Sequence, residues 1–382
     1  MELSISNLGI VCALGNDKDE VVKNISVGKS GISVDTKSVK ELSLPFGFVD
    51  LKEHHIMRCY TLIDMVIAQM KNAIDDIKNN YDLSRIGVVI GTSNTGVGEA
   101  QYHISDWIQN SSCPLEFSFD ELELGSPAIY IKKLLGVEGP VYSVSTACSS
   151  SAKVFNSARR LIENGICDVV IVGGVDSYCP FTQNGFNALE SISHTQTLPM
   201  SKNRSGINLG EGCALFIMQK KTSEDDVVLL GVGESSDAYH LTHPEPNGVG
   251  AEMAMRFALE DAGLKASDID YINMHGTGTV ANDSMESKAI FNIFEDKVVC
   301  ASTKSLTGHC LGASGALELG LSWLMLKYKF VIPHFYDGNF DDELAKIKLV
   351  TGSETITVKT ILSNSFAFGG SNASVILGVK NG

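Results

Sequence analysis

The sequence predicts an α/β protein with largely buried sheets, and three observations support this. Apolar strand-like runs alternate with helical patterns along the chain. The run 168–175 (DVVIVGGV) is apolar almost throughout, as expected of a strand covered on both faces. The stretch 139–165 passes from a β-branched run, Val141 to Thr146, into a helical repeat after Ser149. Together they indicate a βαβ unit centred on Cys148.

The remaining elements of the first half follow the same alternation. The start of the chain (MELSISNLGIVCALG) reads as a first strand, because no basic region precedes its apolar residues. An apolar run, Arg85 to Gly91, leads into a small-residue loop at 92–98, and a helix is expected over Ser126 to Leu135. Another strand is expected over Cys213 to Met218.

The second half repeats this order of elements without a literal sequence repeat. The charged segment Lys220 to Asp226 is the expected boundary, which divides the chain into 1–222 and 223–382. Beyond it we expect strands at 227–231, 269–274, 298–302, 361–365 and 373–379, and helices at 250–262 and 312–327.

Composition limits the class of protein. A chain of 382 residues can bury a large core, and 44% hydrophobic with 20% charged residues is ordinary for a soluble globular protein. No apolar run approaches the ~20 residues of a membrane span. The net charge of −15 argues against nucleic acid as a partner. The nine cysteines are scattered and form no CxxC pair, which predicts reduced thiols in the cytoplasm, with neither a disulfide framework nor a metal site.

Cys148 stands at the predicted strand-to-helix turn. The first free N–H groups and the aligned peptide dipoles of a helix favour an anion, so we expect a lowered thiol pKa and a nucleophilic thiolate. The alternative is a small residue that fits a tight turn and happens to be cysteine.

Three loops that follow strand-like runs carry reactive residues. STACSS, HGTGT and TKSLTGH contain Cys148, His275 and His309. A fourth loop, 364–372 (NSFAFGGSN), contains glycines, which allow the backbone to come close to a neighbouring group. Ligands of α/β proteins gather at strand ends, so the four loops are expected to line one pocket. A cysteine beside imidazoles is the usual composition of covalent acyl transfer, although either histidine alone could be structural.

These motifs resemble the β-ketoacyl-[acyl carrier protein] synthases of the thiolase-like superfamily of condensing enzymes. The resemblance covers nearly the whole chain, with five motifs in the family's order: STACSS, LGEG (209–212), HGTGT with Asp283, TKSLTGHCLGASGALE and FAFGGSN. It implies a five-layered αβαβα fold of two similar halves, usually dimeric.

The resemblance also implies how the reactive residues act. Cys148 would take an acyl group from the phosphopantetheine arm of an acyl carrier protein, with the backbone N–H groups of Cys148 and Phe368 as oxyanion hole. His275 and His309, neutral and protonated on Nε2, would hold the enolate left when malonyl-carrier loses CO₂. The product would be a 3-oxoacyl-carrier.

Further positions match supporting residues of the family. Lys304 and Glu318 would fix the electrostatics around His309, and Phe368 would gate access to the cysteine. Thr277 and Thr279 fall where the family binds the pantetheine arm. Lys202 and Arg204 are candidates for docking the acidic carrier. The resemblance implies no cofactor on the enzyme itself, only the carrier's 4'-phosphopantetheine, and either a homodimer or a heterodimer with a synthase-like partner.

The chain departs from the family pattern at several positions. Ala367 replaces the usual glycine before the gating Phe368, and Val280 replaces a proline. The segment LPMSKNRSGIN replaces the acidic, aromatic-rich segment that usually precedes the glycine loop. Asn94 falls where chain-elongating members place an apolar gate of the acyl tunnel. Asn94 could be satisfied by Ser93 or Thr95 and block the tunnel, or face an unsaturated or aryl-capped chain. These departures suggest a specialised synthase, such as an aryl-polyene type.

Three alternatives compete with this interpretation. A thiolase would carry a second cysteine in its C-terminal glycine loop, where this chain has Phe368. A chain-length factor, the subordinate partner of such synthases, loses the nucleophile that this chain retains. A dinucleotide-binding oxidoreductase would need GxGxxG after its first strand, and HGTGT is a weak phosphate loop.

Overall fold

The computed structural model describes residues 1–35, 44–51, 57–112, 118–221, 223–224, 226–352 and 356–379. The expected boundary segment 220–226 lies partly outside these ranges, so the division into 1–222 and 223–382 stays a prediction.

The described strands form two five-stranded halves of the same topology within one sheet. The N-terminal half has the order β5 (Val141–Val144), β4 (Ile86–Gly91), β6 (Val169–Asp176), β8 (Gly212–Lys220), β1 (Leu3–Cys12). The C-terminal half has the order β11 (Val299–Ala301), β10 (Tyr271–Asn273), β13 (Thr360–Phe366), β14 (Ser371–Gly378), β9 (Val227–Ser236). In each half the first two pairings are parallel and the last two antiparallel. The halves join through a short antiparallel pairing of β1 with β9, and β12 (Lys348–Leu349) extends the edge beyond β11.

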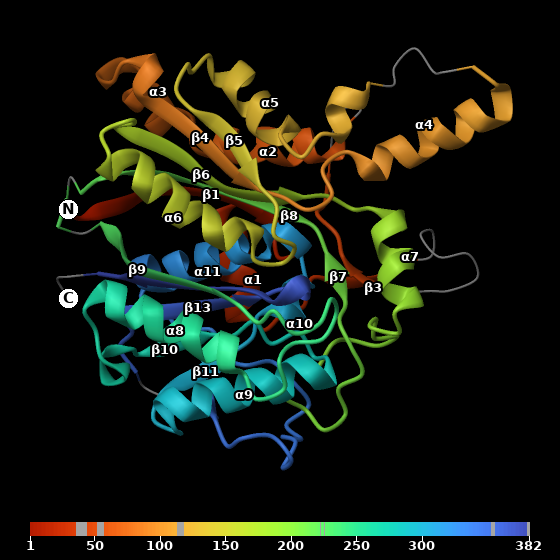
Figure 1. The fold of residues 1–382 in the computed structure, drawn as a ribbon, viewed down its shortest axis with the longest axis vertical. Coiled ribbons are helices and arrows are strands. Elements are labelled where there is room, and N and C mark those ends of the chain that lie inside the picture. The colour runs from red at the N-terminus through yellow and green to blue at the C-terminus, as the bar shows by residue number, and fades with distance from the viewer. Residues whose placement is uncertain are drawn as a thin grey trace.

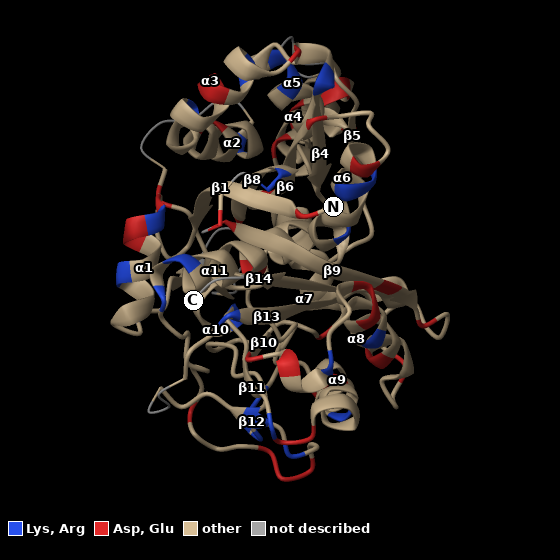
Figure 2. Cartoon of the chain, turned by 90° about the vertical axis from the view of Figure 1, so that its left-hand side faces the viewer, with Lys and Arg blue, Asp and Glu red and all other residues tan. Residues whose placement is uncertain are grey.

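Helices cover the sheets in three layers (Figure 1). One outer layer consists of α2 (Arg58–Gln69), α3 (Lys71–Asn80) and α5 (Ser126–Leu135). The middle layer, between the two sheet halves, contains α6 (Ser150–Glu163) and α11 (Ser314–Tyr328). The other outer layer is α8 (Val249–Ala262) and α9 (Val280–Phe294). Charged residues gather on outer helices and loops, whereas most central strands carry none (Figure 2). This arrangement confirms the expected αβαβα layering.

Several elements lay outside the sequence expectations. Besides α2, α3 and α9, they include α1 (Lys18–Ser26), α4 (Val97–Asn110), α7 (Pro180–Ala188), α10 (Lys304–Thr307), and a small sheet of β2 (Ile32–Asp35), β3 (Leu44–Gly47) and β7 (Leu209–Gly210). Of these, α7 matters most for function, because its residues Thr182 and Phe186 reach the site described below.

The packing of α6 fixes the position of Cys148. The helical repeat predicted after Ser149 is confirmed, and its apolar face is buried in the middle layer. The first turn of α6 lies directly over β4, where a Cβ on Gly91 would come within 2.3 Å of the Ser151 Cα. Only glycine at this position allows the helix so close to the sheet. Ala147, just before the cysteine, has a φ of 51°, which turns the chain sharply from β5 into the helix.

Candidate active site

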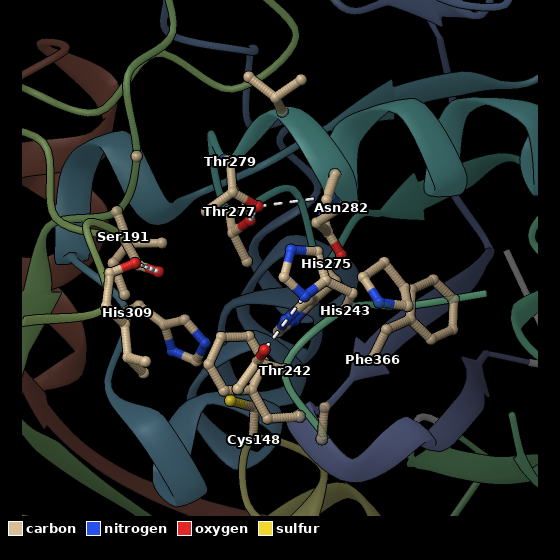
Figure 3. A pocket seen from close by; sticks show the side chains of 18 of the residues that line it. Cys148, Ser191, Thr242, His243, His275, Thr277, Thr279, Asn282, His309 and Phe366 are labelled. Atoms are coloured by element: carbon tan, nitrogen blue, oxygen red, sulfur yellow. Dashed lines mark hydrogen bonds between the residues drawn. The ribbon is translucent and has the colours of Figure 1, made fainter. Parts of the chain in front are cut away.

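The structure brings Cys148, His275 and His309 together from both halves of the chain. Cys148 precedes α6, His275 follows β10, and His309 follows α10. The Cys148 Sγ and one ring nitrogen of each histidine all lie within 4.8 Å of one another. The imidazole centroids are 5.2 Å apart at 86°, and all three side chains are buried. Figure 3 shows both rings beside the cysteine sulfur.

The hydrogen bonds of the two histidines define their tautomers. The Leu311 N–H donates to His309 Nδ1 at 3.1 Å, so this nitrogen is an acceptor and the proton belongs on Nε2. His275 Nδ1 lies 3.4 Å from the Lys304 ammonium, which can only donate. Burial, assisted by the charge of Lys304, lowers the pKa of both imidazoles well below 6.5. Both histidines are therefore neutral Nε2–H donors at physiological pH.

Lys304 and Glu318 form a buried ion pair at the back of the site. The Lys304 ammonium donates to a Glu318 carboxylate oxygen and to the carbonyl oxygen of His275. Burial raises the pKa of Glu318 to about 7, against the opposing effect of Lys304. The charge of Lys304 acts on the His309 imidazole, in agreement with the expected electrostatic role. The direct contact of the ammonium with His275 was not expected, and it arises because α10 points the lysine toward the loop after β10.

The expected lowering of the Cys148 pKa is wrong for this structure. Burial raises the pKa of the thiol to about 11, and this outweighs the Lys304 charge and the backbone N–H groups of Phe368 and Cys148, which lower it. The turn before α6 is itself buried, so desolvation of the thiolate is the largest effect on this pKa. The backbone N–H groups of Phe368 and Cys148 both lie close enough to the sulfur to lower the pKa of the thiol.

Two cavities meet at Cys148. The larger, about 440 Å³, is lined by Thr277, Thr279, both histidines and the loop around Thr242. The smaller, about 170 Å³, lies behind the cysteine. Both are lined by Cys148, Phe186 and Phe368, whose two rings stand 5.7 Å apart. The predicted gating position of Phe368 thus lies at the junction of the cavities, and Phe186 of α7, which sequence reasoning missed, stands opposite it.

Asn94 lines the smaller cavity, where the sequence placed a tunnel gate. Its side chain is 5% exposed, and its Nδ2 donates to the Ser177 carbonyl at 3.0 Å. The first of the two alternatives, satisfaction of the Asn94 amide by Ser93 or Thr95, is therefore wrong. The Asn94 Oδ1 is buried and has no hydrogen-bond partner among the described residues, so Asn94 places an unsatisfied polar atom next to the smaller cavity.

Asp176 anchors this region and escaped sequence reasoning. Its fully buried carboxylate accepts hydrogen bonds from the Thr92 hydroxyl at 2.7 Å, from the Ser93 and Asn94 N–H groups, and from the Gly312 N–H. It therefore holds two loops of the smaller cavity together. The available signal was an aspartate directly after the apolar run 168–175.

The acidic residues of two family motifs hold loops in place and do not lie among the reactive groups. The buried Glu211 of LGEG accepts N–H groups of Val49 and Tyr178 and pairs with Arg58. Asp283 accepts N–H groups of Met200 and Gly278, which fixes the loop after His275.

The two expected docking residues differ in the structure. The Arg204 side chain is 5% exposed and pairs with Asp341 at 2.5 Å and Asp283 at 3.9 Å. A paired, buried guanidinium is not available to a partner, so Arg204 is corrected to a structural residue. Lys202 is exposed and remains a candidate.

The fold and this constellation define a condensing enzyme of the thiolase-like class. The family model "Beta-ketoacyl synthase, N-terminal domain" matches residues 46–224, and "Beta-ketoacyl synthase, C-terminal domain" matches residues 227–336. The chain belongs to the β-ketoacyl synthase family. The expected enzyme class, an acyltransferase of the 3-oxoacyl-[acyl-carrier-protein] synthase type, is thereby confirmed.

Individual relatives agree with this assignment. The chain is 30% identical to 3-oxoacyl-[acyl-carrier-protein] synthase 2 of Coxiella burnetii, over 98% of this chain and 97% of the relative. It is 31% identical to 3-oxoacyl-[acyl-carrier-protein] synthase 1 of Haemophilus influenzae, over 99% of both chains. A chain of the complex of ketosynthase ApeO with its chain length factor ApeC from Xenorhabdus doucetiae is 37% identical, with a TM-score of 0.95, over 99% of this chain and 98% of that one. Within the described residues, no helix is both long and apolar enough to cross a bilayer.

Proposed function

We propose that the chain condenses an acyl group, held as a thioester on Cys148, with malonyl units delivered by an acyl carrier protein. The observation that supports this most strongly is the meeting of Cys148 with two neutral Nε2–H imidazoles where two cavities join. A thiolase-type exchange would require a second reactive cysteine beside Phe368, and the described residues place none in either cavity.

In the first half-reaction, Cys148 attacks the thioester carbonyl of an acyl-carrier. The new bond is Sγ–C, the bond that breaks is the carrier's C–S bond, and the thiol proton ends on the departing pantetheine sulfur. The N–H groups of Cys148 and Phe368 stabilise the tetrahedral oxyanion. Because both imidazoles present Nε2–H toward the cavity, neither is placed as a base for the thiol.

In the second half-reaction, malonyl-carrier loses CO₂. The electron pair of the broken C–C bond becomes an enolate, whose oxygen accepts hydrogen bonds from His275 and His309. The enolate carbon attacks the acyl-Cys148 carbonyl, and the cysteine sulfur leaves and is reprotonated from solvent. The product is a 3-oxoacyl-carrier. Lys304 keeps His275 neutral by opposing a second positive charge beside it, which makes Lys304 a positioning residue.

The smaller cavity suggests the class of acyl group. Its wall combines Phe186 and Phe368 with the polar side chains of Ser93, Asn94 and Thr182. This polar wall offers a saturated chain less apolar contact than an aliphatic wall would, by about 0.8 kcal/mol for each methylene left unpacked. We therefore assign the chain a specialised substrate of the aryl-polyene type rather than a long saturated acyl chain.

Two partners follow from this function. The carrier delivers its 4'-phosphopantetheine through the larger cavity past Thr277 and Thr279, with Lys202 at the docking surface. A second synthase-like chain, identical or homologous, pairs at the edge strand β5, because an exposed strand edge is a pairing site. Apolar side chains at this edge are exposed: Tyr142 of β5 by 37% and Ile129 of the neighbouring α5 by 41%. Figure 1 shows α4 extending away from the N-terminal half.

A cytoplasmic location stays a prediction, in keeping with the free state of all described cysteines.

A panel of acyl-carriers tests this proposal. Each is incubated with the chain, and the mass increment on the Cys148 peptide is measured. We expect acylation at Cys148, its loss in Cys148→Ala, and release of 3-oxoacyl-carrier only after malonyl-carrier is added. Acylation elsewhere, or no turnover by any carrier, would refute the assignment.

A further inference from the structure

Asp176 connects the wall of the smaller cavity to the turn that follows His309. Its Oδ2 accepts the Gly312 N–H at 2.6 Å, and its Oδ1 accepts the Ser93 and Asn94 N–H groups at 2.9 and 3.0 Å. Gly312 lies so close to this carboxylate that a Cβ there would come within 2.8 Å of Oδ2. The close approach requires glycine, and the carboxylate fixes where the turn lies.

The same turn holds Leu311 in a conformation that residues with a side chain disfavour. Leu311 has a φ of 51°, in the left-handed region. A backbone in this region persists when its surroundings hold it there. The Leu311 side chain lines the smaller cavity, and its N–H donates to His309 Nδ1 at 3.1 Å. Because the next N–H along the chain, that of Gly312, is bound to Asp176, the carboxylate keeps the Leu311 N–H directed at the imidazole.

The Leu311 N–H decides which nitrogen of His309 carries the proton. The Ser314 hydroxyl also lies 2.9 Å from Nδ1, but a hydroxyl can donate or accept and therefore tolerates either tautomer. A backbone N–H can only donate, so it requires Nδ1 to be free of a proton. The proton then belongs on Nε2, from which His309 donates to the enolate oxygen of the proposed second half-reaction.

We propose that Asp176 is a positioning residue of the condensation, which holds the Leu311–Gly312 turn so that His309 keeps its proton on Nε2. This inference deepens the proposed function and rests on it, because the enolate is the group that the proton serves. The role is separate from that of Lys304, whose ammonium contacts His275. Each of the two imidazoles then has its own charged supporting residue.

The substitution Asp176→Asn should break this connection selectively. Oδ1 accepts two backbone N–H groups and the Thr92 hydroxyl, whereas Oδ2 accepts the Gly312 N–H at 2.6 Å and the Ser93 hydroxyl at 2.7 Å. The amide oxygen is expected at the Oδ1 position, because a hydroxyl can turn to accept and an N–H group cannot. The amide NH₂ group then faces the Gly312 N–H, and the turn loses its anchor.

The two half-reactions are measured separately. Without an acyl group, malonyl-carrier loses CO₂, and the enolate takes a proton from water to give acetyl-carrier. In Asp176→Asn the kcat of this decarboxylation should fall by about 10- to 100-fold with little change in KM, because the donor to the enolate is misplaced. Acylation of Cys148 should not slow, because the charge of Asp176 raises the pKa of the thiol and its removal favours the thiolate.

The matched control is Thr92→Val, which removes a hydrogen bond to the other oxygen of the same carboxylate. It should decarboxylate malonyl-carrier at close to the wild-type rate. Equal slowing of both half-reactions by Asp176→Asn would overturn the proposal, as would an equal loss of decarboxylation in Thr92→Val.

The tautomer itself is measured without turnover, from the ¹⁵N chemical shifts of a chain labelled at its nine histidines. The His309 signals are identified by their loss in His309→Gln. Nδ1 should carry no proton in the wild type and should gain one in part in Asp176→Asn. Ser314→Ala should leave the proton on Nε2, and this variant tests the role of Leu311 even where Asp176→Asn does not fold.

Unchanged His309 signals in folded Asp176→Asn, or a proton on Nδ1 in Ser314→Ala, would overturn the proposal. The spectra need no substrate, so they stand whether or not condensation is observed. A wild-type chain that shows the expected tautomer but does not decarboxylate malonyl-carrier would refute the proposed function instead.

Discussion

Alkylation of Cys148 by iodoacetamide should accelerate with pH well beyond the range in which an ordinary thiol has ionised. Burial raises the pKa of Cys148 from 9.0 to about 11. At pH 8 about one thiol in a thousand is then ionised, against about one in ten for an unperturbed thiol. The thiolate is the reactive species, so ionisation alone predicts a roughly hundredfold deficit at this pH.

Part of that deficit is recovered by nucleophilicity. A thiolate of higher pKa attacks faster, with a Brønsted coefficient of about 0.4–0.5. Over a pKa difference of about two units this returns roughly six- to tenfold. The net expectation is an alkylation rate about ten- to sixteenfold below that of an ordinary thiol at pH 8, still rising about tenfold per pH unit up to about pH 11.

The assay is a series of short alkylation pulses between pH 7 and 11, with modification of the Cys148 peptide followed by mass spectrometry. The unfolded chain supplies the reference profile, and Cys148→Ala identifies the peptide. Restricted access slows the reaction equally at every pH, so the shape of the profile decides the question. A plateau below pH 9 in the folded chain would show that the start of α6 lowers the pKa of the thiol by more than burial raises it, and would refute this reasoning.

Three further outcomes are expected. Asn94→Ile replaces a polar wall residue of the smaller cavity by an apolar one, so acylation should shift toward saturated chains by about four- to 15-fold, the equivalent of one or two buried methylene groups at about 0.8 kcal/mol each. Unchanged rates across a chain-length series would show that Asn94 does not line the acyl tunnel. Lys202→Glu should raise KM for acyl-carrier but not for a small pantetheine thioester. Arg204→Glu should instead lower the free energy of unfolding by about 3–5 kcal/mol in urea titrations, because it breaks a buried ion pair. Equal effects of the two changes on KM and on stability would contradict the assignment of Lys202 to docking and of Arg204 to structure. Burial lowers the pKa of His334 to about 4 from 6.5. Below pH 6.5 the unfolded chain therefore binds a proton on this histidine that the folded chain does not bind. The free energy of unfolding should fall with pH for this reason, by about 3 kcal/mol at about pH 4. Buried carboxyl groups with raised pKa act in the opposite sense, so the difference between wild type and His334→Asn, measured from pH 7 to 4, isolates the histidine; parallel curves would contradict this.

The features predictable from the sequence were local ones. The period of apolar residues fixed the helix after Ser149, and the predicted helix Ser126–Leu135 agrees with α5 at both ends. Reactive residues directly after apolar strands pointed to one pocket, because strand ends converge in α/β folds. Cys148, His275 and His309 do meet there.

The features that escaped prediction depend on burial and on pairing between distant segments. The Cys148 pKa follows from the desolvation of its turn, which local sequence does not encode. Arg204 looked like a surface charge until Asp341, far along the chain, was found beside it. Lys304 reaches His275 rather than His309 because α10 sets its direction. Asp176 was missed because its donors come from separate loops.

The most direct test of the central claim separates acylation from condensation in the His275→Ala and His309→Ala chains. Each is given acyl-carrier alone, and the Cys148 adduct is measured; malonyl-carrier is then added, and CO₂ and 3-oxoacyl-carrier are followed. The neutral Nε2–H donors are assigned to the enolate and not to the thiol, so both chains should form the acyl-enzyme at close to the wild-type level and fail to decarboxylate or condense. Loss of the acyl-enzyme as complete as the loss of condensation would contradict the account, and would make a histidine the base for Cys148 instead.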